Sequence, residues 1–137
     1  MGTPCTIALE DKHGHIAAVH CHWDGYPKHA GRILLQHYSD PVKLTKLIAH
    51  GNLSSLGPDI GTQHDFDAHD PSVCTFYARD RGEGLRRNIY SCFKERQWSG
   101  DLEEYNYILR NDGKWYTSRH EKDLTPLEKV MQQESQT

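Results

Sequence analysis

The segment His20-Cys21-His22-Trp23-Asp24 carries the residue types with the most direct chemical potential. Two histidines that are two positions apart on an extended strand project from the same face, because side chains alternate along a strand. Imidazole and carboxylate groups are ligands of zinc, so His20, His22 and Asp24 are a candidate site for zinc or another divalent metal. Such a site would indicate a metal-dependent hydrolase. In the competing interpretation, the two histidines lie on a half-exposed face of a sheet without any metal.

A second candidate is the charged glycine loop that begins at Arg79 and ends at Gly84, followed closely by Arg86. Arginine forks bind phosphate groups with two parallel hydrogen bonds, and glycines let backbone N–H groups approach an anion. Arg79, Arg81 and Arg86 are therefore candidate ligands for a phosphorylated signalling nucleotide. Alternatively, Asp80 and Glu83 neutralise these arginines in an exposed loop.

The third feature of interest is a set of aromatic residues beside this polar chemistry, Trp23, Tyr26 and Tyr38. Trp23 and Tyr26 stand beside the histidines, and such residues anchor protein partners or stack on bases. Core packing is the other role open to large aromatic side chains, and it is the favoured interpretation for Trp23.

Alternating apolar residues and turn signals predict the elements that would position these groups. Residues 5–10 and 15–22 form a predicted hairpin around a turn at 11–14, and residues 104–110 and 114–119 form another around Asn-Asp-Gly at 111–113. A further strand is predicted at 73–78. In the first hairpin, Val19, Cys21 and Trp23 share the face that we expect to be core, so that His20 and His22 point away from it.

Three helices are predicted, over residues 27–38, from Pro41 to the glycine at 51, and from a capping box at Thr125 to about Gln133. Asp40 is the expected N-cap of the second. Residues 52–72 are predicted to be a long loop, whereas residues 85–98 fit a strand or a helix. The fold class is therefore α+β, with an antiparallel sheet of about five strands and two to three short helices on one face. Residues 1–133 form one predicted domain and residues 134–137 a flexible tail.

The composition of the chain restricts the expected cellular compartment and the classes of binding partner. The chain has 137 residues and a formal net charge of -3, which disfavours non-specific binding of nucleic acid. No apolar run approaches the ~20 residues of a membrane span, and the first residues lack a signal-peptide pattern. We therefore expect a cytoplasmic protein with reduced thiols. The four cysteines have no Cys-x-x-Cys spacing, which argues against a four-thiolate zinc site or a redox motif.

The block Cys21-His22-Trp23-Asp24-Gly25-Tyr26-Pro27 resembles a family of small, mostly uncharacterised bacteriophage and prophage proteins. The likeness continues through residues 31–38, 51–56 and 75–83, and covers most of the chain up to about residue 110. The resemblance implies a phage protein that acts in the bacterial host cytoplasm, but it assigns no catalytic residues.

Small phage proteins of this kind often inhibit host defence by binding, so the first functional hypothesis is an anti-CRISPR-like or other anti-defence protein. It would bind a host defence protein or complex stoichiometrically, without catalysis. Sequestration of a signalling nucleotide by the arginine loop and hydrolysis at the His-x-His site are the alternatives.

Overall fold

The computed structural model describes residues 3–68, 70–85, 88–90, 105–119 and 124–135. Within these ranges eight strands form one sheet. The central strands are β1 (Cys5–Glu10) and β2 (Ile16–Cys21), which pair as the predicted antiparallel hairpin. At their turn, the carboxylate of Asp11 accepts hydrogen bonds from the backbone N–H groups of His13 and His15, and Gly14 has a φ of 85°.

The sheet is mixed rather than purely antiparallel. β6 (Tyr105–Leu109) lies parallel to β1, and its hairpin partner β7 (Trp115–Arg119) continues the sheet to the short strand β8 (Thr125–Pro126). On the other side, β3 (Leu53–Ser55) is parallel to the end of β2, and β4 (Thr75–Phe76) is antiparallel to β3. β5 (Asn88–Tyr90) pairs with the beginning of β2. The α+β class is confirmed, but the prediction of about five antiparallel strands is wrong in number and in direction.

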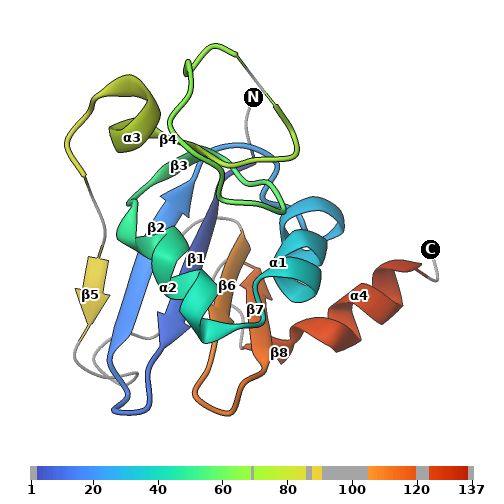
Figure 1. Ribbon diagram of the computed structural model, residues 1–137. Helices are drawn as coiled ribbons and strands as arrows, with labels where there is room; N and C mark the ends of the chain where they lie inside the picture. Colours follow the sequence, from blue (N-terminus) through green and yellow to red (C-terminus); the bar gives the residue numbers. More distant parts are fainter. Residues whose placement is uncertain (1–2, 69, 86–87, 91–104, 120–123, 136–137) are drawn as a thin grey trace.

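Helices cover one face of this sheet (Figure 1). They are α1 (Arg32–His37) with the π-helical turn η1 (Pro27–Gly31) before it, α2 (Pro41–Ala49) and α4 (Leu127–Ser135). Asp40 caps α2 as predicted, since its carboxylate accepts from the N–H of Val42 at 2.9 Å. The predicted capping box at Thr125 is wrong, because Thr125 and Pro126 pair with β7 and α4 begins at Leu127. α4 also continues past the predicted helix end at Gln133.

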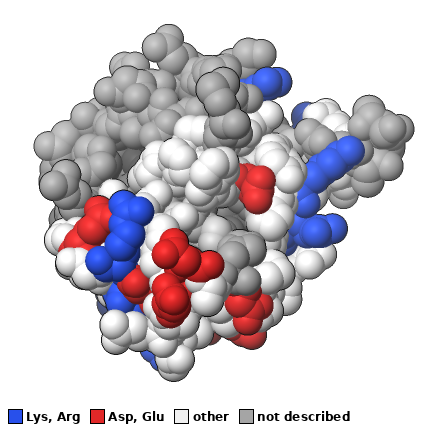
Figure 2. Space-filling model, turned by 90° about the horizontal axis from the view of Figure 1, so that it is seen from above, with Lys and Arg blue, Asp and Glu red and all other residues white. Residues whose placement is uncertain are grey.

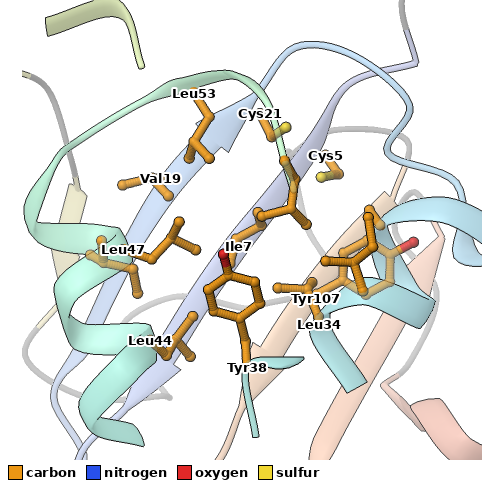
Figure 3. Packing of buried hydrophobic residues seen from close by; sticks show 14 of the residues in the cluster. Cys5, Ile7, Val19, Cys21, Leu34, Tyr38, Leu44, Leu47, Leu53 and Tyr107 are labelled. Carbon is orange, nitrogen blue, oxygen red and sulfur yellow. The ribbon is translucent and has the colours of Figure 1, made fainter. Parts of the chain in front are cut away.

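The main core lies between the sheet and these helices. Ile7, Val19, Cys21 and Tyr107 face it from the strands, and Leu34, Tyr38, Leu44 and Leu47 face it from the helices (Figure 3). Ile16, Ala18, Ala8 and Ile108 form a smaller buried cluster on the opposite face of the sheet. The predicted division of β2 into two faces is therefore confirmed for its apolar residues.

A short helix includes the first half of the predicted arginine loop. After β4 the chain enters α3 (Tyr77–Arg81), and Gly82 ends it in the left-handed conformation with a φ of 74°. α3 lies at the same end of the molecule as β4 and the long connection of residues 56–74 (Figure 1). In the described part of the chain, no helix has the length and apolar character that would let it cross a membrane.

Candidate functional site

The turn after β2 presents two aromatic side chains on a firmly held backbone. The N–H groups of His22 and Trp23 donate to the carbonyls of Leu53 and Ser54, which extends the parallel pairing beyond the strands. The N–H of Gly25 donates to Thr3 O at 2.6 Å, and the hydroxyl of Tyr107 donates to Gly25 O at the same distance. The segment from residue 22 to 26 is therefore fixed from both sides.

Trp23 and Tyr26 are nevertheless exposed, by 43% and 40% respectively. The interpretation of Trp23 as a core residue is therefore wrong, because β2 ends at Cys21 and the side chain of Trp23 does not continue the core-facing alternation of Val19 and Cys21. The edge of the His22 ring packs against the Trp23 ring with centroids 4.7 Å apart. Large exposed aromatics on a rigid segment are a recognised feature of binding surfaces.

A pocket of about 400 Å³ opens beside Trp23. It lies where the carboxyl ends of the parallel strands β2 and β3 meet the start of β4. Its lining residues come from the turn, from β3 and β4, and from the long connection: Trp23, Asp24, Ser54, Ser55, Phe66, Asp67 and Thr75. The pocket therefore combines two aromatic rings with two carboxylates and three hydroxyls.

Most polar side chains of this pocket are unused inside the protein. The side chains of Asp24, Asp67, Ser54 and Ser55 have no hydrogen bond or ion pair with any residue that the structure describes. Ser54 is the most enclosed of them, with 9% of its surface exposed. Asp24 and Asp67 are exposed, so their carboxylates are open to a ligand that enters the pocket.

Arg79 is fully engaged in holding the fold. Its guanidinium donates to the carbonyl oxygens of Ile60, Gly61 and Cys74 at 2.9–3.1 Å, and its Nε donates to the Asp80 carboxylate at 2.9 Å. It also lies over the Phe76 ring. The prediction that Arg79 binds a ligand is therefore not supported, because its donors fasten the long connection to β4 and α3.

Arg81 has a different environment from Arg79. It pairs with Glu83, and its guanidinium stacks over the rings of Phe66 and Tyr77 at 4.6 and 5.0 Å from their centroids. Half of its side chain remains exposed. Arg86, the third member of the predicted cluster, lies outside the described residues. The structure thus does not gather a free guanidinium cluster from Arg79 and Arg81.

Within the part of the chain that the structure describes, the predicted metal ligands are not arranged as a metal site. The rings of His20 and His22 are near each other, with centroids 6.1 Å apart. However, among residues 3–68, 70–85, 88–90, 105–119 and 124–135, no group of three or more His, Cys, Asp or Glu is arranged to hold a metal ion. His20, His22 and Asp24 all lie within these ranges, so their geometry does not support a zinc or other divalent site.

A chain of polar contacts below the pocket was not predicted from the sequence. His64 Nε2 lies 3.1 Å from Thr75 Oγ1, and His64 Nδ1 lies 3.1 Å from Thr62 O. Because a carbonyl only accepts, the neutral ring carries its proton on Nδ1 and accepts from the Thr75 hydroxyl. Asp80 Oδ1 is 3.7 Å from Nδ1, beyond hydrogen-bond distance, and Thr75 is buried. The arrangement therefore lacks the base–carboxylate bond of a hydrolase triad and supports the pocket floor instead.

The buried carboxylate of Asp80 connects the residues that lie below the pocket. Its carboxylate accepts from Arg79 and from the backbone N–H groups of Phe76 and His64. Burial alone raises the pKa of Asp80, but these hydrogen bonds outweigh burial, so the pKa of this carboxyl lies below its usual value. The sequence gives no sign of this structural role of Asp80. The role depends on contacts with residues 60–64, which are distant in the sequence.

The end of the molecule that bears the pocket is rich in acidic side chains. Viewed from this end, they gather centrally on the described surface, with basic side chains toward its sides (Figure 2). Asp24 and Asp67, which line the pocket, are both exposed.

Comparisons with protein-family models, with curated proteins and with solved structures find no match. The resemblance to phage proteins therefore stays a prediction, and the site must be interpreted from its own geometry.

Proposed function

We propose that this protein acts by stoichiometric binding of a protein partner through the surface around Trp23 and Tyr26. The observation that carries the proposal is the exposure of both aromatic rings on a backbone segment that hydrogen bonds hold in place. Tryptophan and tyrosine dominate the binding energy of many protein interfaces. A segment that is already ordered loses little conformational freedom when it binds.

The charge of this surface indicates the character of the partner. Asp24 and Asp67 are exposed and line the pocket beside Trp23, so a partner with a basic surface is favoured by electrostatic complementarity. In the setting implied by the resemblance to phage proteins, the partner is a bacterial host defence protein or complex, and binding in the host cytoplasm inhibits it. Defence proteins that handle nucleic acid carry basic surfaces of the required kind.

The two alternative functions have less support from the geometry. Sequestration of a phosphorylated nucleotide needs free guanidinium groups, whereas Arg79 is committed to carbonyl oxygens and to Asp80. Phosphate would also be repelled by the acidic surface. Metal-dependent hydrolysis needs three protein ligands, which His20, His22 and Asp24 do not provide in this arrangement.

Affinity purification from bacterial host cells tests the proposal. The tagged protein is compared with Trp23→Ala and with Val42→Ala, which removes an exposed apolar side chain on α2. We expect a host protein to be retained in a fixed ratio by the original protein and by Val42→Ala. With the purified partner, Trp23→Ala should weaken binding by about 30-fold or more.

Circular dichroism and thermal unfolding verify that each variant is folded. The proposal is wrong if no host protein is retained stoichiometrically. It is equally wrong if a folded Trp23→Ala, Tyr26→Ala double variant keeps the full affinity.

A further inference from the structure

We propose that the pocket beside Trp23 is a receptor for an arginine side chain of the partner protein. This inference rests on the proposed function, and it names the chemical group that the partner inserts. The observation behind it is one cavity of about 400 Å³, lined by two aromatic rings and by four polar side chains that have no partner among the described residues.

The polar groups of the pocket favour a ligand that is a cationic hydrogen-bond donor. Asp24 and Asp67 are acceptors only when ionised, and neither has a hydrogen-bonding or ionic partner among the described residues. The hydroxyls of Ser54 and Ser55 add further acceptors on the β3 side. Ser54 lines the pocket although only 9% of its surface is exposed, and its hydroxyl has no partner among the described residues, so it can bind a ligand atom in place of water.

The aromatic walls favour a planar guanidinium over a compact ammonium. Trp23 and Phe66 line the pocket from the turn and from the long connection respectively. Guanidinium groups stack on aromatic faces and present several N–H donors in one plane. Phe66 already accepts this kind of contact, since the guanidinium of Arg81 lies 4.6 Å from its ring centroid.

Other ligand classes fit the pocket less well. The carboxylates of Asp24 and Asp67 would repel a ligand that carries a phosphate or a carboxylate group. A divalent metal ion needs more ligands than the pocket brings together, because Asp24 and Asp67 belong to no group of three such side chains among the described residues. The volume lies near the lower end of ~300–1,000 Å³ for ligand pockets, which suits a single long side chain.

The backbone conformation of Asp24 allows a substitution that removes its charge and keeps the turn. Its φ of 58° places it in the left-handed region, which asparagine tolerates at least as well as aspartate. Asp24→Asn therefore removes the charge without disturbing the turn. Asp67→Asn removes the second carboxylate of the pocket, and Glu128→Gln on α4 is a matched loss of one exposed carboxylate away from the pocket.

The probes are N-acetyl-arginine amide and its neutral analogue N-acetyl-citrulline amide, titrated into the ¹⁵N-labelled protein. The indole N–H signal of Trp23 is assigned with Trp23→Phe, and the buried Trp115 serves as an internal control. We expect arginine amide to shift the Trp23 signal in a saturable manner, citrulline amide to bind at least about fivefold more weakly, and Trp115 to be unaffected. Asp24→Asn and Asp67→Asn should each weaken arginine binding by about fivefold or more, and Glu128→Gln should not.

An unchanged Trp23 signal, equal shifts with both probes, or equal binding by Asp24→Asn would overturn the arginine pocket. Such a result would leave the proposed function intact if Trp23→Ala still releases the host partner. Conversely, arginine binding in the absence of any host partner would support the pocket while contradicting the proposed function.

Discussion

The hydroxyl of Tyr107 donates a hydrogen bond of 2.6 Å to the carbonyl of Gly25, across 82 positions of the sequence. Tyr107 is a core residue of β6, whereas Gly25 lies two positions after Trp23 in the turn that forms the proposed binding surface. The core of the sheet therefore fixes the exposed turn directly. The geometry of the surface depends on a residue that no partner would touch.

Tyr107→Phe should lower the free energy of unfolding by about 1–2 kcal/mol, because the buried Gly25 carbonyl loses its donor while the ring still fills the core. The indole signal of Trp23 should also shift, since the turn is released. Urea unfolding and NMR spectra measure the two effects. Unchanged stability together with an unchanged Trp23 signal would mean that this bond does not hold the turn.

Gly25→Ala should destabilise the protein by about 1–3 kcal/mol through steric overlap. A Cβ atom at this position would lie 2.6 Å from Cys5 Cβ and 2.7 Å from Thr3 O, which is too close for either neighbour. Gly84→Ala is the matched control, because its Cβ would meet nothing within 4 Å, and we expect a change within about 0.5 kcal/mol. Thermal or urea unfolding of both variants gives the comparison, and similar stabilities would refute the packing argument.

Arg79→Gln should destabilise the protein by about 3–5 kcal/mol, whereas Arg81→Gln should cost about 1 kcal/mol or less. Arg79 is largely buried and neutralises Asp80, so its removal leaves a buried charge unpaired. Arg81 is half-exposed and pairs with Glu83 at the surface. Chemical unfolding of the two variants tests this contrast. Equal losses, or a folded Arg79→Gln that has lost only a ligand, would restore Arg79 as a binding residue.

Acid should weaken the fold through Asp80. The pKa of Asp80 is lowered in the folded protein, so its carboxylate contributes stability above its unfolded pKa of about 3.9. That contribution is lost as the pH falls toward the folded pKa. In urea unfolding from about pH 6 down to about pH 3, Asp80→Asn should be much less stable than the original protein at pH 6, with a smaller difference at pH 3. A difference that stays constant over this range would show that Asp80 is not ionised in the fold.

The sequence identified elements whose signals are local. Asp11 and Gly14 set the first hairpin turn, Asp40 caps α2, and alternation along β2 separates Val19 from Ile16. Each of these features follows from neighbours within a few positions. The corresponding predictions are therefore confirmed.

Elements that depend on distant pairing were missed. β3 was predicted to be a loop, because Leu53-Ser54-Ser55 has no strand alternation and is a strand only through its pairing with Cys21 and β4. The arginine loop became α3 because Asp80 accepts from the N–H of Phe76 and binds Arg79. Trp23, a predicted binding residue, lines the pocket, and its role in binding stays a prediction. Its pocket partners Ser54 and Asp67 were missed, since nothing local in the sequence brings these residues together with it.

The parallel pairing of Cys5 with Tyr105 has a consequence for biosynthesis. The first hairpin leaves the ribosome early, but one whole edge of β1 stays uncovered until almost all of the chain has been made. An unpaired strand edge can form hydrogen bonds with other chains. Nascent and prematurely terminated chains that lack β6 are therefore prone to aggregation. Stable folding must therefore be a late event, completed only when β6 docks beside the strand that was synthesised first.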